Sequence, residues 1–235
     1  IDLVQGNGFA KQGYPARALF SIPFVGINEK GNPVCINEKG QATVGDLNFQ
    51  ERNNTDYLIY EGSTDPIYNG SLGNTFNYKG FHLNLFLTYA FGNVVRLDPV
   101  FKAKYNDLTS MTHDFKNRWM QPGDENVTNV PGVVSRYEYE QNRTLLSTAY
   151  NAYNYTSVRT AKGDFIRLKE ISLAYDFPHR WLENSPVNNI SLKLQATNLM
   201  LLYADKKLNG QDPEFMNAGG VASPMPKQFT LTLKL

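Results

Sequence analysis

The end of the chain shows the plainest alternation of apolar and polar positions. From Phe229 to Leu235, Phe and Leu occupy every second position, and Thr or Lys fills the positions between them. The stretch 190–197 repeats the pattern, with Ile, Leu, Leu and Ala set against Ser, Lys, Gln and Thr. Successive side chains of a strand point to opposite faces, so each stretch has one apolar face and one polar face. The pattern predicts two β-strands.

A hairpin is predicted around Lys79-Gly80, where two further alternating stretches meet. The glycine supplies the positive φ that a two-residue hairpin turn requires. Tyr78 and Phe81 flank the turn, and each lies on the apolar face when it is counted along its own strand. Residues that pair directly share a face, so the two counts agree on one register.

Six strands are expected in all, and long and short connections alternate between them. The connections 28–66, 96–163 and 204–227 are long. Leu108, Met111, Phe115 and Trp119 have helical spacing, which predicts a helix over 107–120. In the fourth strand the apolar positions change phase, and a bulge near Lys169-Glu170 explains the change. The six strands are predicted at 16–27, 67–78, 81–95, 164–177, 190–203 and 228–235.

Alternation alone fits two architectures. In a soluble sandwich the apolar face packs on a core, whereas in a membrane barrel it meets lipid and the polar face lines a wet lumen. Alternating loop lengths favour an up-and-down barrel, with short turns on one side and long external loops on the other. An unstructured stretch as long as 96–163 counts against a compact soluble domain. The fold class predicted is therefore all-β, an antiparallel up-and-down transmembrane β-barrel.

This fold assigns residues to its two surfaces and to one interface. The lipid-facing residues expected are Leu83, Leu85, Leu87, Leu192, Leu194, Leu231 and Leu233. The lumen-facing residues expected are His82, Asn84, Thr88, Lys193, Gln195, Thr230 and Thr232. An aromatic girdle is expected from Tyr78, Phe81, Tyr175, Phe177 and Trp181.

Composition and motifs indicate no catalytic chemistry. A formal net charge of +1 gives no electrostatic case for nucleic acid or an anionic surface. The single cysteine, Cys35, excludes a disulfide scaffold and a thiolate metal cluster. His82, His113 and His179 are scattered, with no zinc motif around them. No apolar run is long enough for a transmembrane helix. We therefore expect no enzyme activity, no metal and no cofactor.

Short motifs spread over nearly the whole chain add to this pattern. None is specific alone, but their order and spacing resemble the C-terminal part of SusC-like (SusC/RagA) TonB-dependent outer-membrane transporters. In chain order they are GYP at 13–15, YKGF at 78–81, FGN at 91–93, RW at 118–119, PGD at 122–124, Pro131, FIRLK at 165–169 leading into 171–178, ATNL at 196–199, GQDPE at 210–214 and Pro224.

The resemblance implies a barrel of ~22 strands, of which this chain, 1–235, is the C-terminal portion. It implies import of oligosaccharides or peptides across the outer membrane of a Gram-negative bacterium. It also implies that the rest of the same transporter, a plug and further strands, lies outside this chain. Two separate partner proteins are implied: a SusD-like surface lipoprotein and TonB. The chain departs from the family at Leu235, where such barrels usually end in an aromatic residue. Two other functions are weighed: a secreted glycan-binding β-sandwich and an outer-membrane adhesin barrel.

Substrate contacts are expected in the loops of such a transporter, where aromatic side chains adapt to ligands at low entropic cost. For Trp119 two roles are open: packing between loops, or stacking on a sugar ring or peptide. For Asp212 a turn formed with Pro213 and a Ca²⁺ ligand are weighed. The contact residues expected are Trp119, Tyr137, Tyr139, Tyr153 and Asp212.

Overall fold

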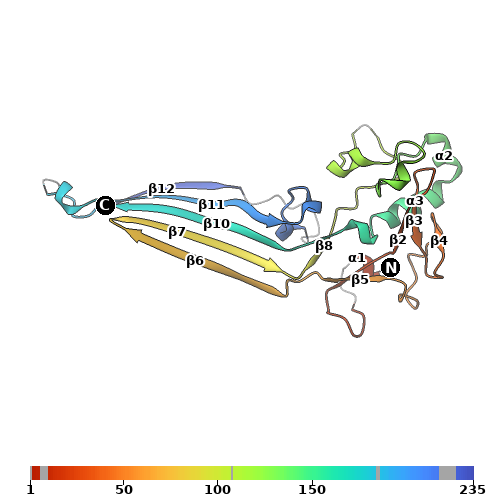
Figure 1. Ribbon diagram of the computed structural model, residues 1–235, viewed down its shortest axis with the longest axis horizontal. Helices are drawn as coiled ribbons and strands as arrows, with labels where there is room; N and C mark the ends of the chain where they lie inside the picture. The colour runs from red at the N-terminus through yellow and green to blue at the C-terminus, as the bar shows by residue number, and fades with distance from the viewer. Residues whose placement is uncertain (1, 6–9, 107, 184–185, 217–225) are drawn as a thin grey trace. The chain divides into compact units, whose positions relative to one another are not determined.

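The computed structural model describes residues 2–5, 10–106, 108–183, 186–216 and 226–235. Figure 1 shows that strands predominate over helices, as an all-β class predicts. The chain divides into two compact units. We call Pro66–Asn93 with Lys162–Leu235 the sheet unit, and Ile1–Asp65 with Val94–Ala161 the mixed unit.

The sheet unit is built on one antiparallel sheet of five strands, in the order β12-β11-β10-β7-β6. β12 and β6 are therefore its two edges. These five strands overlap the last five strand ranges predicted from the sequence. Their bounds are β6 (Tyr68–Tyr78), β7 (Phe81–Phe91), β10 (Phe165–Asp176), β11 (Ser191–Ala204) and β12 (Gln228–Lys234).

The turn between β6 and β7 has the two residues predicted. Lys79 and Gly80 both have positive φ, at 45° and 84°, which the tight hairpin turn with matching twist requires. Tyr78 pairs with Phe81 across it. Gly80 also packs closely on the next strand, because a Cβ there would lie 2.9 Å from the carbonyl oxygen of Asp176. A side chain at position 80 would therefore disturb both the turn between β6 and β7 and the packing of that turn against β10.

β10 contains the predicted bulge. Its register with both neighbouring strands shifts between Leu168 and Glu170, which leaves Lys169 outside the pairing. The extra residue restores the phase, so Leu168 and Ile171 lie on the same face although three residues separate them. The phase change seen in the sequence is thus confirmed as a bulge, and the strand keeps one apolar face along its length.

The described residues of the mixed unit include a short helix, α1 (Asp2–Gln5), and two small antiparallel sheets, and a third small sheet ends at the boundary with the sheet unit. β1 pairs with β5, β2 with β3 and then β4, and β8 with β9. The bounds are β1 (Ala18–Ser21), β2 (Phe24–Ile27), β3 (Pro33–Ile36), β4 (Ala42–Thr43), β5 (Ile59–Ser63), β8 (Val94–Arg96) and β9 (Thr160–Lys162).

A four-residue repeat, Asn-Glu-Lys-Gly, forms the two turns of the β2-β3-β4 sheet. The side-chain oxygens of Asn28 and Asn37 each accept bonds from the main-chain N–H of the second and fourth residues that follow, at 2.9–3.1 Å. Gly31 and Gly40 then take φ values of 79° and 75°. Side-chain oxygens of Asn favour such turns, and glycine tolerates the positive φ.

Two α-helices lie in the connection that was predicted to be a long loop, 96–163. They are α2 (Arg136–Gln141) and α3 (Arg143–Tyr153). The 3-10 helices among the described residues are His113–Asn117, Asp124–Asn126, Ser157–Arg159, His179–Trp181, Lys206–Leu208 and Pro213–Phe215. Leu146, Ala149 and Tyr150 of α3 form a buried cluster with Ala103. No helix among the described residues is long and apolar enough to cross a membrane.

The first predicted strand, 16–27, is wrong as a strand of the large sheet. It is divided at Pro23 into β1 and β2, which belong to different sheets. Proline has no N–H to donate to a ladder, so the run cannot continue as one paired strand. The strand predicted at 81–95 divides likewise at Gly92, whose φ is 86°. β8 then pairs with β9 and not within the large sheet.

The helix predicted over 107–120 is also wrong, except for one 3-10 turn at His113–Asn117. Asp107 lies outside the described residues. Leu108 is 94 % exposed, whereas the ring of Phe115 lies 5.3 Å from that of Tyr105. The apolar residues that suggested one helical face therefore do not pack together against a single surface.

Candidate functional site

The strand pairing of the sheet separates its residues into an apolar face and a polar face. Paired residues share a face, and the register links all five strands. The apolar face holds every residue predicted to face lipid: Leu83, Leu85, Leu87, Leu192, Leu194, Leu231 and Leu233. The polar face holds every residue predicted to face a lumen: His82, Asn84, Thr88, Lys193, Gln195, Thr230 and Thr232.

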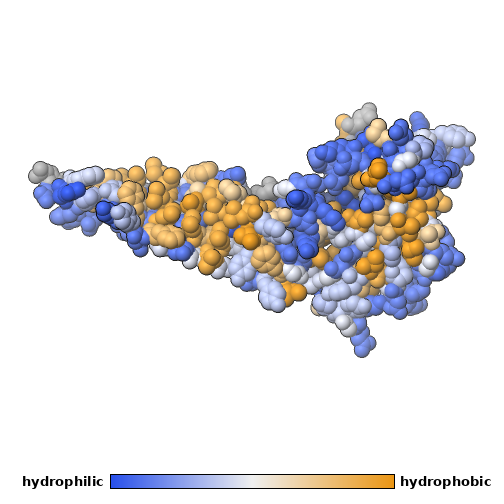
Figure 2. All heavy atoms as spheres, in the orientation of Figure 1, coloured by the Kyte–Doolittle hydropathy of each residue, from blue (hydrophilic) through white to orange (hydrophobic). Residues whose placement is uncertain are grey.

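The apolar face is largely uncovered in this structure. Figure 2 shows hydrophobic residues gathered over the middle of the five strands. Leu72, Leu194 and Leu231 are 62 %, 54 % and 68 % exposed. Contiguous apolar patches of this kind are rare on soluble proteins and mark contact with a membrane or a partner.

Aromatic side chains gather where the sheet meets its short turns. The ring of Tyr175 lies 4.4 Å from that of Phe81 and 5.2 Å from that of Phe177, and Trp181 follows at 6.1 Å from Phe177. Tyr78 pairs with Phe81 and is 69 % exposed. The structure thus brings together the five residues of the predicted girdle. Aromatic side chains with one polar end suit a membrane–water interface.

At the same end, the polar face carries a hydrogen-bonded cluster around His82. Its Nδ1 lies 2.6 Å from Asn77 Oδ1, and its Nε2 lies 2.9 Å from Asp176 Oδ2. The three residues come from β6, β7 and β10. Further along, Thr75 donates to the side chain of Asn84 at 3.1 Å. These bonds join neighbouring strands, and the cluster contains no nucleophile beside the imidazole.

The polar face is less polar than its sequence pattern suggested. Phe86 covers Gly73 of the neighbouring strand, because a Cβ at Gly73 would lie 3.3 Å from the ring. Phe165 and Ala90 pair on the same face and are buried. An aromatic ring laid over a strand glycine replaces the packing that the glycine lacks.

A buried ion pair on the polar face connects β10 to the loop that follows β11. Arg167, 4 % exposed, binds both carboxylate oxygens of Asp212 through Nη2, and Glu214 Oε2 lies 3.1 Å from the same nitrogen. Asp212 was predicted as a substrate contact, but its side chain is only 9 % exposed. Its carboxylate also caps a short helix by accepting from the N–H of Glu214 at 3.1 Å. Of the two roles weighed for Asp212, this geometry matches the turn.

Arg167 is a residue that the sequence analysis missed. The signal that could have found it is an arginine on the polar face of an alternating strand, together with an acidic Asp-Pro-Glu segment later in the chain. Such charges are rarely fully buried without a partner. Its importance depended on a contact between residues 45 positions apart, which the sequence alone does not reveal.

Trp119 packs between two glycine-containing segments of the mixed unit. A Cβ at Gly31 would lie 2.4 Å from the indole, and one at Gly132 would lie 2.8 Å from it. The indole Nε1 donates to Glu125 Oε2 at 3.0 Å, and Gly132 donates its N–H to the carbonyl of Gly31 at 2.8 Å. The half-buried ring packs on both glycines, and its one donor is already bonded. The packing role is therefore favoured over ligand stacking.

The three predicted contact tyrosines lie in different environments. Tyr137 is 79 % exposed. Tyr139 is half-buried and lies 3.2 Å from the Ser147 hydroxyl. Tyr153 is 2 % exposed and donates to the carbonyl of Asn129 at 2.9 Å. Burial raises the pKa of Tyr153. Packing encloses the Tyr153 ring, so this geometry does not favour its predicted contact with substrate.

Among the residues that the structure describes, no group of three or more His, Cys, Asp or Glu residues is placed to hold a metal ion. Cys35 is fully buried, and burial raises the pKa of its thiol to about 12. A thiol in that state is a poor nucleophile and a poor metal ligand at neutral pH.

Comparison with known proteins gives sequence relatives and structures of the same fold, while no family model matches the chain. TonB-dependent receptor P39 of Formosa agariphila is 27 % identical over 192 residues, which cover 77 % of this chain and 17 % of the relative. TonB-dependent receptor P3 of the same organism is 26 % identical over 160 residues, covering 65 % and 13 %. The matches thus span less than a fifth of the length of either relative.

Solved structures of the RagAB peptide transporter share the fold. One superposes with a TM-score of 0.64 at 21 % identity, covering 95 % of this chain and 23 % of that chain. The importer in its "closed-closed" state gives a TM-score of 0.62 at 20 % identity. All these proteins are named as receptors or transporters. Sequence and fold together support the resemblance of this chain to SusC/RagA-like TonB-dependent receptors.

Proposed function

We propose that this chain forms part of the barrel wall of a TonB-coupled importer in the outer membrane of a Gram-negative bacterium. The importer takes up oligosaccharides or peptides and works with a SusD-like surface lipoprotein. The sheet supplies the wall, its apolar face meeting lipid and its polar face meeting the lumen. The remaining strands and the plug come from residues outside this chain, so the edges β12 and β6 pair with other strands of the parent barrel.

One observation carries this proposal: the uncovered apolar face, which spans all five strands. Exposed apolar surface costs about 25 cal/mol per Å² in water, so a face of this kind needs lipid or a partner to cover it. The aromatic cluster at the short-turn end supports lipid as that cover, because aromatic girdles mark the edges of the apolar band in such barrels. A β-sandwich would pack this face against a second sheet, which the exposed Leu72, Leu194 and Leu231 do not match.

Fractionation of cells that produce the parent protein tests the location and the closed barrel. We expect the protein in the outer-membrane fraction, with an electrophoretic mobility that changes on boiling because a folded barrel resists detergent. A soluble protein with the same mobility before and after boiling would contradict the proposal. Uptake of labelled oligosaccharides and peptides, with and without TonB, then tests transport itself.

A further inference from the structure

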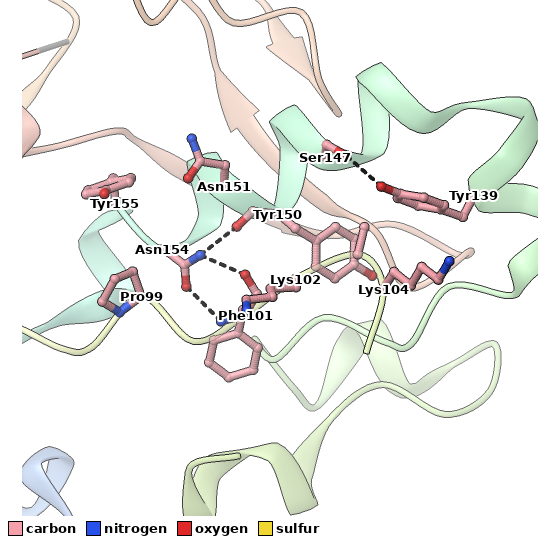
Figure 3. A pocket seen from close by; sticks show the side chains of 11 residues that line it. Pro99, Phe101, Lys102, Lys104, Tyr139, Ser147, Tyr150, Asn151, Asn154 and Tyr155 are labelled. Atoms are coloured by element: carbon pink, nitrogen blue, oxygen red, sulfur yellow. Dashed lines mark hydrogen bonds between the residues drawn. The ribbon is translucent and has the colours of Figure 1, made fainter. Parts of the chain in front are cut away.

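A cavity of about 430 Å³ lies within the mixed unit, between the segment 99–104 and helix α3. Figure 3 shows its lining, with Lys102 and Lys104 on one side and Tyr139, Ser147 and Asn151 from α2 and α3 on the other. Phe101 and Tyr150 form a buried apolar floor. A cavity with an apolar floor and a few convergent polar groups has the usual construction of a small-ligand site.

The main chain at the cavity is already engaged. Asn154 accepts from the N–H of Phe101 at 3.1 Å and donates to its carbonyl at 2.8 Å. The next N–H, that of Lys102, donates to the Tyr105 hydroxyl at 2.9 Å. Peptides that bind in extended form rely on main-chain hydrogen bonds along a free edge. The cavity offers side-chain donors and ring faces in place of such an edge.

The charge at the cavity is positive. Lys102 and Lys104 line it together with no carboxylate side chain, and both are exposed. Neither lysine forms an ion pair with any residue that the structure describes. The hydrogen bond with Ser147 lowers the pKa of Tyr139, and the charges of Arg143 and Lys104 lower it further. The uncompensated lysines favour an anionic group over a neutral one.

Two aromatic rings also line the cavity. Tyr139 and Tyr155 line the cavity and are half-buried, and Lys104 Nζ lies 5.8 Å from the centre of the Tyr139 ring. Tyrosine combines an apolar ring face with a hydroxyl that can hydrogen-bond, which suits a ligand with both ring faces and polar edges. Asn151 is exposed at the same rim and adds an amide that can donate and accept.

We propose that this cavity is a subsite for an acidic sugar unit of an imported oligosaccharide. Lys102 and Lys104 bind the carboxylate or sulfate of the sugar, and Tyr139 and Tyr155 contact its ring. The inference rests on the proposed import function and assigns a substrate class to it. Carboxylate and sulfate present the same chemistry to two ammonium groups, so the test includes both.

The test measures ligand affinity by calorimetry with the complete receptor in detergent. The probes are a galacturonate trisaccharide, a sulfated galactose trisaccharide, the neutral galactose trisaccharide and an acidic tripeptide. We expect one or both acidic sugars to bind, with the neutral sugar and the tripeptide much weaker. In the cavity variant, which combines Lys102→Gln and Lys104→Gln, the affinity for the acidic sugar should fall about tenfold or more, because two charge-assisted contacts are lost.

The matched control removes the same charge elsewhere in the mixed unit. Lys30→Gln with Lys39→Gln changes two exposed turn lysines that do not line the cavity, and binding should be unchanged. Equal affinity of the cavity variant and the wild type for the acidic sugars would overturn the subsite. Tighter binding of the neutral sugar or the tripeptide would also overturn it.

Uptake in cells separates failure of the subsite from failure of the import function. If TonB-dependent uptake is measured but the cavity variant imports acidic sugars at the wild-type rate, the subsite is wrong and import stands. If the acidic trisaccharide binds in a lysine-dependent way but no uptake occurs, the subsite stands as a binding site and the import function is wrong.

Discussion

Adjacent residues of β7 differ in the cost of a charge, because they lie on opposite faces of the sheet. Leu85 lies on the apolar face and Asn84 on the polar face. We expect Leu85→Arg to destabilise the folded receptor in lipid by roughly 2–4 kcal/mol, the cost of arginine near the midplane of a bilayer. Asn84→Arg should be far milder, since it loses one bond from Thr75 and lies on the polar face. Urea titration of the receptor folded in vesicles measures both.

The pair is its own control, because the strand and the introduced charge are the same. Leu231→Arg and Thr232→Arg repeat the comparison on edge strand β12. Equal destabilisation by the two members of either pair would contradict the assignment of the faces.

Trp119 is predicted to stabilise the mixed unit by packing. Trp119→Ala should cost about 2–3 kcal/mol locally, less than for a fully buried tryptophan, because the indole fills the space over Gly31 and Gly132. This local loss of stability should appear as faster hydrogen exchange at the N–H of Gly132, which donates to the carbonyl of Gly31. Trp119→Phe keeps a ring but loses the bond to Glu125, and it should be intermediate. Weaker ligand binding in Trp119→Ala, with hydrogen exchange at Gly132 unchanged, would contradict the packing role and support a ligand contact.

Residue faces could be predicted from the sequence, but residue environments could not. The side on which Leu83 or Thr232 lies depends only on the two-residue period of a strand. The Tyr153 ring packs on Phe24 and Phe101, and the role of Asp212 depends on Arg167, all of them distant in the chain. Long-range contacts of this kind leave no local pattern in the sequence.

At the scale of elements, the Arg167–Asp212 ion pair is predicted to hold the loop after β11 against β10. Asp212→Ala should cost about 3–5 kcal/mol, because it leaves a buried guanidinium short of a partner. Glu214, 3.1 Å away, offsets part of this loss. Limited proteolysis of the loop 205–216 should become faster in the variant.

The control for this loop is an ion pair in solvent. Asp56, whose carboxylate is 91 % exposed, pairs with Lys11 at 2.7 Å. Asp56→Ala should leave the proteolysis of 205–216 unchanged, since exposed pairs contribute little. Unchanged cleavage in Asp212→Ala would show that the loop is held by its apolar contacts, such as the buried Leu208, and not by the ion pair.

The elements that the sequence predicted best are those that depend on local rules. The Lys79-Gly80 turn and the bulge at Lys169 follow from turn chemistry and strand period. Helix α3 was missed although Leu146, Ala149, Tyr150 and Tyr153 have helical spacing. Ser135 also caps α2 by accepting from the N–H of Glu138, a recognisable start signal. The competing pattern at 107–120 has similar spacing but its residues pack on separate partners.

At the scale of the whole molecule, the long connections 28–66 and 96–163 are not unstructured loops. They supply most of the mixed unit, with its own buried residues such as Phe20, Ile22 and Cys35. Frequent polar residues, Asn among them, made these stretches resemble plain loops in the sequence. Their folding depends on contacts between two stretches far apart in the chain, so local patterns understate it.

Site-directed thiol labelling tests the central claim, that the apolar face of the sheet meets lipid. Leu231→Cys and Thr232→Cys place thiols on opposite faces of β12, in a parent receptor whose cysteines outside this chain are replaced. Cys35 stays in place, because it is fully buried and its pKa of about 12 keeps it protonated at pH 8. Each thiol is labelled with a fluorophore and exposed to a lipid-bound quencher or to iodide in water.

We expect the lipid-bound quencher to act on the label at position 231 and iodide to act on the label at position 232. That result would establish that the sheet is a membrane-facing wall with a wet inner surface. Quenching of both labels by iodide, and of neither by the lipid-bound quencher, would contradict the account, because the apolar face would then be covered by something other than lipid.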